Sequence, residues 1–329
     1  MVKFKKLTAL IMSAALALGA AGCGSAGKSD DGKLKIVCTI FPEYDWVREL
    51  LGDKAEDADV TYLLDKGADL HSFQPTAEDI MKISVCDLFI YVGGESDNWT
   101  QDALKEATNK DMKTLNLLDT VGSAAKEEEV KEGMQGEEEE HGMEEEEEEG
   151  PEYDEHVWLS VKNAKTIVSA ICDDICELDK DNSEEYRKNL ESYTAELDAL
   201  DKDFTDLAAS ASVKTLLFGD RFPFRYFVDD YGFDYYAAFV GCSAETEASF
   251  ETIAFLAGKV DELGLDTVYT IEGSDGSIAQ SIVNSSEKKS AKIVKLDSAQ
   301  SVSAEKLKEG TTYTGIMRSN LEVLKSTLN

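Results

Sequence analysis

Two of the three histidines in this chain stand in short polar segments whose residue types suit a metal ion. His71 lies in residues 69–76 (DLHSFQPT), between a predicted strand and a predicted helix, and His156 lies in residues 154–159 (DEHVWL), just before another predicted helix. Imidazole nitrogen is the commonest side-chain ligand for zinc and related ions. A single loop histidine is more often an ordinary surface residue, so the fold must bring the two together before they form a site.

The sequence lacks the residue patterns that are typical of catalysis. It contains no Gly-x-Ser-x-Gly segment, no phosphate-binding P-loop and no nucleophile grouped with a base. The aromatic residues of segment 218–236 are compatible with a carbohydrate or aromatic ligand, but aromatics at helix and strand spacing more often belong to a core. We therefore expect a binding protein and not an enzyme.

The first half of the chain alternates between predicted strands and helices. Residues 85–92 are apolar except for Asp87, a pattern that is typical of a strand buried on both faces. Alternation of this kind indicates a parallel sheet, and ligands bind where loops leave the carboxyl ends of its strands. The predicted strands are 34–40, 60–64, 85–92 and 113–116, and the predicted helices are 44–51, 76–84 and 99–108.

The second half repeats this pattern after two helices. Residues 183–209 predict one long helix of about 40 Å at 1.5 Å per residue. The shorter predicted helices are 161–178, 224–231, 250–263, 279–286 and 313–328, and the predicted strands are 213–218, 234–238, 267–271 and 292–296. The fold class is therefore α/β, with two lobes that each contain a parallel sheet. We expect an N-terminal lobe at 34–182, a linking helix at 183–209 and a C-terminal lobe at 210–329.

The N-terminus predicts export and a lipid anchor. Three lysines precede the apolar run 7–18, which is far shorter than the ~20 residues that span a membrane. Small residues then lead directly to Cys23, an arrangement that resembles the bacterial lipobox. We expect a signal peptide at 1–22, lipidation of Cys23 and a flexible tether at 23–33, which places the protein outside the cytoplasm on the cell membrane. The other interpretation is a plain secretory signal with a chance cysteine.

The net charge of −34 argues against a nucleic-acid partner. Much of this charge is local, because 17 acidic residues and two lysines lie between residues 126 and 156. A run of this kind repels itself and buries little apolar area, so segment 124–153 is predicted to be a disordered loop. His141 lies in this loop and is a candidate for accessory, loose metal binding together with the carboxylates.

Five cysteines remain beside Cys23, and an odd number cannot all pair within one chain. Cys38 and Cys86 fall in two predicted strands and are the candidates for a disulfide bridge. The other interpretation is that most of these thiols are small buried hydrophobic groups. The five are Cys38, Cys86, Cys172, Cys176 and Cys242.

The two histidine segments resemble those of the metal-binding subunits of bacterial metal-uptake ABC transporters, the zinc/manganese solute-binding family. The closing segment 313–321 (YTGIMRSNL) and the position of the acidic insertion follow the family's order, although the family's insertion is often rich in histidine. The resemblance covers essentially the whole mature chain. It implies a monomeric lipoprotein that captures a divalent metal, with zinc as the leading expectation, and delivers it to the permease and ATPase of an ABC importer.

The resemblance also implies a set of ligands. His71 and His156 would come from the N-terminal lobe. The family's third ligand falls on Arg221, whose guanidinium has no lone pair for a cation, so Asp220 is the expected substitute. Glu272, at the end of a predicted strand, is the expected fourth ligand.

Three alternatives stay open at this point. Cys242 also follows a predicted strand of the C-terminal lobe, where a thiolate would favour zinc, unless it is a packed or free thiol. Carboxylate ligands favour manganese or iron, but Thr311 replaces the aspartate that some manganese-binding members carry. A non-metal ligand, an anion or a metal chelate bound through Arg221 and Arg225, is the other reading of the same fold.

Overall fold

The computed structural model describes residues 32–136, 152–243 and 247–329. The predicted signal peptide, the lipidation of Cys23 and the accessory role of His141 lie outside these residues. Within the described ranges, no helix is both long and apolar enough to cross a membrane.

Two parallel four-stranded sheets form the centres of two lobes. The first sheet has the order β2-β1-β3-β4, with β1 Lys35–Cys38, β2 Asp59–Tyr62, β3 Leu88–Tyr91 and β4 Lys113–Asn116. The second has the order β6-β5-β7-β8, with β5 Thr215–Arg221, β6 Asp234–Phe239, β7 Thr267–Ile271 and β8 Lys292–Leu296. The α/β fold class with two parallel-sheet lobes is therefore confirmed.

Helices cover both sheets, as parallel crossovers require. In the first lobe they are α1 Phe41–Leu51, α2 Ala77–Val85, α3 Trp99–Glu106, α4 Leu117–Val121 and α5 Val161–Leu178. In the second lobe they are α7 Arg225–Tyr231, α8 Phe250–Glu262, α9 Ser277–Ser285, α10 Ala304–Lys308 and α11 Tyr313–Leu328.

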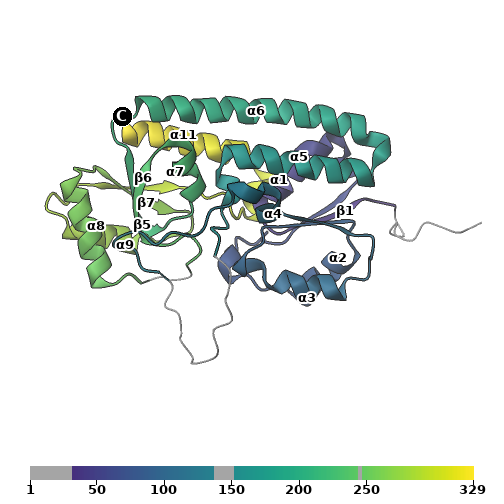
Figure 1. Cartoon of the computed structure of the whole chain (residues 1–329), viewed down its shortest axis with the longest axis horizontal. Helices are drawn as coiled ribbons and strands as arrows, with labels where there is room; N and C mark the ends of the chain where they lie inside the picture. Colours follow the sequence, from purple (N-terminus) through teal and green to yellow (C-terminus); the bar gives the residue numbers. More distant parts are fainter. Residues whose placement is uncertain (1–31, 137–151, 244–246) are drawn as a thin grey trace, which may run out of the picture.

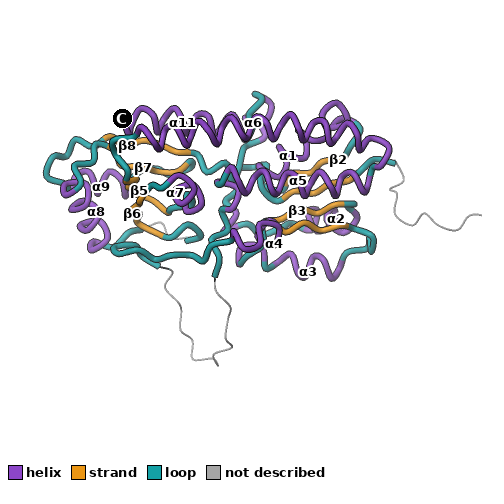
Figure 2. The backbone as a smooth tube through the Cα atoms, turned by 45° about the horizontal axis from the view of Figure 1, so that its top comes forward, coloured by secondary structure: helices purple, strands orange, loops and turns teal. Residues whose placement is uncertain are grey.

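The long helix α6, Ser183–Ser210, runs along both lobes beside α11 (Figures 1 and 2). It contacts α1 and α5 of the first lobe and α7 of the second. Its buried residues recur at spacings of three, four or seven positions, which gives one apolar stripe facing both lobes. These residues are Tyr186, Tyr193, Leu197, Leu200, Phe204 and Leu207.

The two lobes share one hydrophobic core, so they are fixed to each other at the level of the site. The Trp46 ring of α1 packs edge-on against Tyr313 at the start of α11, with ring centroids 5.2 Å apart. The Tyr313 hydroxyl donates to the carbonyl of Trp158 at 2.6 Å, and the Trp158 indole donates to the carbonyl of Ser298 at 2.7 Å. The residues that follow His156 are therefore held by the C-terminal lobe.

Most predicted elements are confirmed, and the differences have local causes. Helix α1 begins at Phe41, three residues earlier than predicted, because Pro42 fits a first helical turn and Glu43 accepts from the Ile40 backbone N–H. Strand β3 is shorter than the apolar run 85–92, since Val85 ends α2. Cys38 and Cys86 are free thiols, so the structure holds no bridge between them.

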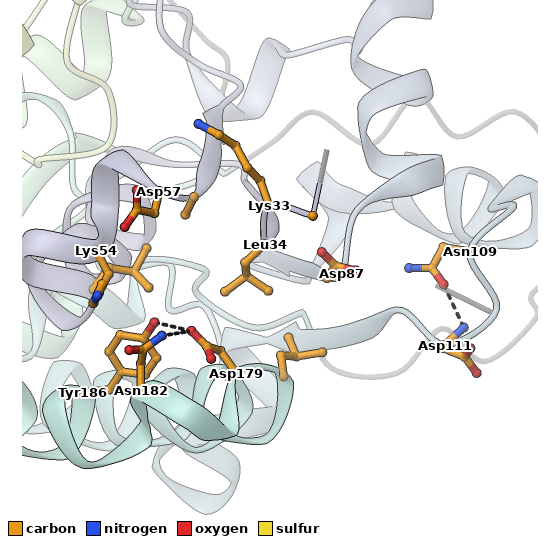
Figure 3. Close-up of a pocket in the computed structure, with 14 residues that line it drawn as sticks. Lys33, Leu34, Lys54, Asp57, Asp87, Asn109, Asp111, Asp179, Asn182 and Tyr186 are labelled. Carbon is orange, nitrogen blue, oxygen red and sulfur yellow. Dashed lines mark hydrogen bonds between the residues drawn. The ribbon is translucent and has the colours of Figure 1, made fainter. Parts of the chain in front are cut away.

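One hollow of about 460 Å³ lies where β1, β3 and β4 begin (Figure 3). The Tyr186 hydroxyl and the Asn182 amide both donate to Asp179 within it, at 2.6 and 2.7 Å. It lies at the amino ends of the strands, and it contains none of the predicted ligands. In open α/β sheets, ligands bind at the opposite end.

The close contact between β5 and α9 gives a test of this packing. A Cβ on Gly219 would lie 2.4 Å from the Ala279 Cα, which is backbone and cannot move aside. Gly219→Ala should therefore lower the free energy of unfolding by about 1–3 kcal/mol. Gly258→Ala is the matched control in the exposed interior of α8, where the added methyl meets no atom within 4 Å; it should raise that free energy by about 1 kcal/mol. Urea unfolding of both variants checks the pair.

Candidate metal site

His71 is held at the carboxyl end of the first sheet by its own loop. The loop after β2 forms a single 3₁₀ turn, Leu70–Ser72, which is anchored by the buried Leu70. The Asp69 side chain caps this turn, accepting from the His71 backbone N–H at 3.0 Å. The loop conformation thus follows from an Asp two residues before the histidine.

His156 is held in the same way. The Asp154 carboxylate accepts from the His156 backbone N–H at 2.9 Å and faces the ring Nδ1 at 3.0 Å. The His156 ring is fully buried and packs against Trp158, with centroids 5.1 Å apart. A carboxylate on Nδ1 fixes a proton there, which leaves the lone pair on Nε2.

The other ring is oriented by a hydroxyl and a second carboxylate. His71 Nδ1 lies 2.8 Å from the Ser96 hydroxyl, and Ser96 in turn hydrogen-bonds Glu155 through its backbone N–H at 2.9 Å and through its side chain. Because the Ser96 hydroxyl donates to this carboxylate, it accepts from His71 Nδ1–H. Burial, with His156 nearby, holds the pKa of His71 well below its usual value, so this ring is neutral at neutral pH. Its Nε2 lone pair is therefore also free.

The two Nε2 atoms face each other at 3.2 Å. In tetrahedral zinc sites with Zn–N bonds of about 2.0–2.1 Å, two ligand nitrogens lie about 3.3 Å apart. The pair therefore already has the spacing of two ligands on one tetrahedral ion.

Cys242 completes a group of three ligand atoms. It follows β6, and its Sγ and the two imidazole nitrogens all lie within 4.8 Å of one another. The preceding Gly241 allows this approach, because a Cβ there would lie 2.9 Å from the Phe222 carbonyl and 3.2 Å from His156 Cε1. Burial raises the pKa of the Cys242 thiol, and the carboxylates of Asp154 and Glu155 add to the effect.

Asp220 and Glu272 do not join this group among the described residues. Asp220 accepts from the backbone N–H groups of Arg221 at 3.0 Å and Ile271 at 3.4 Å. Glu272 accepts from the Ser298 backbone at 2.7 Å and from its hydroxyl. Burial, with Asp297 nearby, raises the pKa of Glu272 to about 7. Both carboxylates are thus occupied by the loops of their own lobe.

Arg221 pairs across the cleft with Asp69, the residue that caps the His71 turn, and also donates to the Ser243 carbonyl at 3.3 Å. The residue at the family's ligand position therefore connects the C-terminal lobe to the His71 loop.

The described flanks of the acidic insertion are ordered, so the expectation of a disordered loop is wrong for residues 124–136 and 152–153. Glu127 and Tyr153 form an antiparallel bridge, and the Glu128 backbone N–H donates to the Glu152 carbonyl at 2.9 Å. The Lys126 N–H donates to the Tyr226 hydroxyl at 3.0 Å. The remainder of the insertion, 137–151, lies outside the described residues.

Comparison with known proteins identifies the family of the chain. Residues 36–327 match the model of the family described as zinc-uptake complex component A, periplasmic (ZnuA). The chain belongs to the ZnuA family. It is 32% identical over 330 residues to the high-affinity zinc uptake system protein ZnuA of Bacillus subtilis, covering 99% of this chain and 98% of that one. It is 30% identical to the zinc-binding lipoprotein AdcA of Streptococcus pneumoniae, covering 98% of this chain and 61% of AdcA.

Two solved structures share the fold. The Zn(II)-bound ZnuA-like domain of Streptococcus pneumoniae AdcA matches with a TM-score of 0.68 and 28% identity, covering 90% of this chain and 99% of that one. The metal-dependent lipoprotein YcdH of Bacillus subtilis matches with a TM-score of 0.70 and 27% identity over similar shares. The chain spans 56% of the length of the AdcA zinc-binding proteins from Streptococcus pyogenes that it matches.

The Asp154–His156 contact predicts how strongly orientation matters. Asp154→Asn keeps the shape of the side chain but removes the charge that fixes the proton on Nδ1, so zinc binding should weaken about 10- to 100-fold. Competition with a zinc chelator measures the change. The control is Asp173→Asn on α5, which removes an exposed ion pair with Arg187 of α6. This variant should bind zinc as the unaltered protein does. Equal affinity in both variants would contradict the assigned role.

Proposed function

We propose that this protein captures zinc outside the cytoplasm at a site formed by His71, His156 and Cys242, and delivers it to an ABC importer. The single observation that carries the proposal is the pair of imidazole nitrogens 3.2 Å apart, each with its other nitrogen held by a hydrogen-bond partner. Two converging lone pairs repel each other unless a cation or a proton lies between them. Capture of a divalent ion relieves that repulsion.

Zinc fits these ligands better than manganese does. Imidazole and thiolate donors favour zinc, whereas manganese prefers carboxylate and carbonyl oxygen. The relatives named for zinc uptake and the Zn(II)-bound AdcA domain support the same choice. The proposed role is binding and transfer of the ion, without a chemical step on a substrate.

The remaining parts of the proposal concern the membrane. We infer that Cys23 carries the lipid anchor and that the permease and ATPase of the importer receive the ion. The family's description as a component of a zinc-uptake complex supports the partners, and the lipoprotein name of the pneumococcal relative supports the anchor.

The anion-binding alternative has less support, because both arginines are already paired. Arg221 pairs with Asp69, and Arg225 pairs with Glu129 and Asp229. An anionic ligand would have to displace these carboxylates. A metal ion at the histidine pair leaves them in place.

Substitution of single ligands distinguishes the two candidate sets for the C-terminal lobe. His71→Ala, His156→Ala and Cys242→Ser should each weaken zinc binding by more than about 100-fold, since each removes a donor from a site that needs about four. Asp220→Asn and Glu272→Gln should bind zinc nearly as the unaltered protein does. Chelator competition on the purified proteins measures all five. If Cys242→Ser keeps full zinc affinity and the two carboxylate variants lose it, Asp220 and Glu272 are the ligands from the C-terminal lobe.

The raised pKa of Cys242 predicts a proton linked to zinc binding. The thiol is protonated at pH 7 and must lose its proton to become a ligand, so affinity should rise about tenfold per pH unit below the thiol pKa. His71 adds little to this trend near neutral pH, because its own pKa is lowered and the ring is already neutral. Titration calorimetry in buffers of different ionisation enthalpy counts the protons released. Cys242→Ser should release one fewer, and an unchanged count would exclude the thiolate.

A further inference from the structure

Residues 126–136, here called the strap, connect the N-terminal lobe to the far side of the cleft. The strap begins as a short antiparallel ladder with the residues just before His156. In this ladder the Asp154 N–H donates to the Lys126 carbonyl at 2.9 Å, and the Glu128 N–H donates to the Glu152 carbonyl at 2.9 Å. Since His156 lies two residues after Asp154, the strap and the site share one local framework.

The strap then docks on the C-terminal lobe along β6. Lys131 pairs with Asp234 at 2.5 Å, at the start of that strand. The Gln135 N–H donates to the Ala238 carbonyl at 2.9 Å, near its end. Gly133 lies against the Phe255 ring so closely that no side chain would fit there. These contacts fix the backbone of the strap on both sides of the cleft.

Glu128 is the strap residue that contacts Cys242, although its own carboxylate is not one of the three ligand atoms that lie within 4.8 Å of one another. Its carboxylate accepts from the Cys242 backbone N–H at 3.1 Å and also hydrogen-bonds the Cys242 side chain. It lines a cavity of about 230 Å³ together with His71, Glu155 and Cys242. The thiol that faces the two histidines is therefore also in contact with this carboxylate.

We propose that Glu128 is the fourth ligand of the captured ion, so that the strap forms part of the metal site. The proposal rests on the proposed zinc function. Three ligands from His71, His156 and Cys242 leave one position of a tetrahedron open, and a zinc site closed to water takes four protein donors. A thiolate and one carboxylate would bring the charge of the site with a divalent ion to zero.

The other carboxylates around the site already have different roles. Asp154 faces the Nδ1 atom of His156, on the side of the ring away from the ion. Glu155 holds Ser96 and lies 3.5 Å from His71 Nδ1, again on the far side of a ring. Asp69 pairs with Arg221. Glu128 instead contacts the ligand sulfur itself, so a cation that replaces the thiol proton takes over a contact this carboxylate already makes.

The test compares Glu128→Gln with Glu127→Gln. Glutamine at 128 keeps the size of the side chain and an oxygen for the Cys242 N–H, but it lacks the charge. Glu127 is the matched control, because it lies next to Glu128 in the same ladder and its side chain is exposed. In chelator competition, Glu128→Gln should bind zinc more than about tenfold more weakly, and Glu127→Gln should match the unaltered protein.

Cobalt(II) saturation separates a ligand from a residue that only positions Cys242. The ligand-field absorption should shift in Glu128→Gln, because a donor atom on the ion has changed, while the thiolate-to-cobalt band persists. Weaker binding with an unchanged spectrum would overturn the proposal, and so would full affinity. If Glu128→Gln fails to fold, judged by circular dichroism, Glu128→Asp takes its place, since it keeps the charge but withdraws the carboxylate by one methylene and should shift the same bands.

Failure of this proposal is distinguishable from failure of the zinc function. If His156→Ala and Cys242→Ser lose zinc while Glu128→Gln keeps both affinity and spectrum, the function stands and Glu128 is not a ligand. If the unaltered protein itself binds no zinc, the function fails first.

Discussion

The approach of the two imidazole Nε2 atoms to 3.2 Å, with each Nδ1 already held by another group, is the interaction on which the rest of the site depends. Left alone, the rings would rotate or separate. They are kept in place because each Nδ1 has a hydrogen-bond partner. Asp154 holds His156, and Ser96, itself bound to Glu155, holds His71. The surrounding protein therefore stores an unfavourable contact in the metal-free state, and a divalent ion converts it into two coordinate bonds. A preorganised pair of this kind avoids the loss of side-chain freedom that flexible ligands incur on binding.

The two imidazoles keep this spacing only if the two lobes stay fixed relative to each other. The shared core beneath α6, the Trp158–Ser298 contact and the Arg221–Asp69 pair all cross between the lobes. Arg221 is instructive here, because the resemblance places a metal ligand at its position. The guanidinium cannot coordinate a cation, and it instead fixes the turn that presents His71. In the proposed site the C-terminal lobe supplies its ligand, Cys242, from the loop after β6, the strand next to β5.

The sequence predicted the two-lobe framework, whereas the ligands expected from the C-terminal lobe, Asp220 and Glu272, remain a prediction that the structure does not favour. Both histidine segments and most helices and strands follow from local patterns, such as Asp two residues before each histidine and the apolar run that includes β3. The positions of Cys242 and Glu128 depend on long-range packing that no local pattern encodes. Cys242 was a candidate from the sequence only because it follows a predicted strand of the C-terminal lobe. Charge density suggested disorder for the whole insertion, yet Lys131 and Gln135 bind β6 through specific contacts.

The path of the strap has a consequence for the solubility of the protein. Strand β6 is the outermost strand of its sheet, and an exposed strand of this kind offers unpaired backbone groups to other chains. The Gln135 N–H of the strap donates to the Ala238 carbonyl, and Lys131 pairs with Asp234 at the other end of the strand. A charged segment laid along a sheet border is one of the ways in which natural proteins discourage strand-to-strand aggregation. The strap therefore protects this border of the second sheet from pairing with the sheets of neighbouring copies.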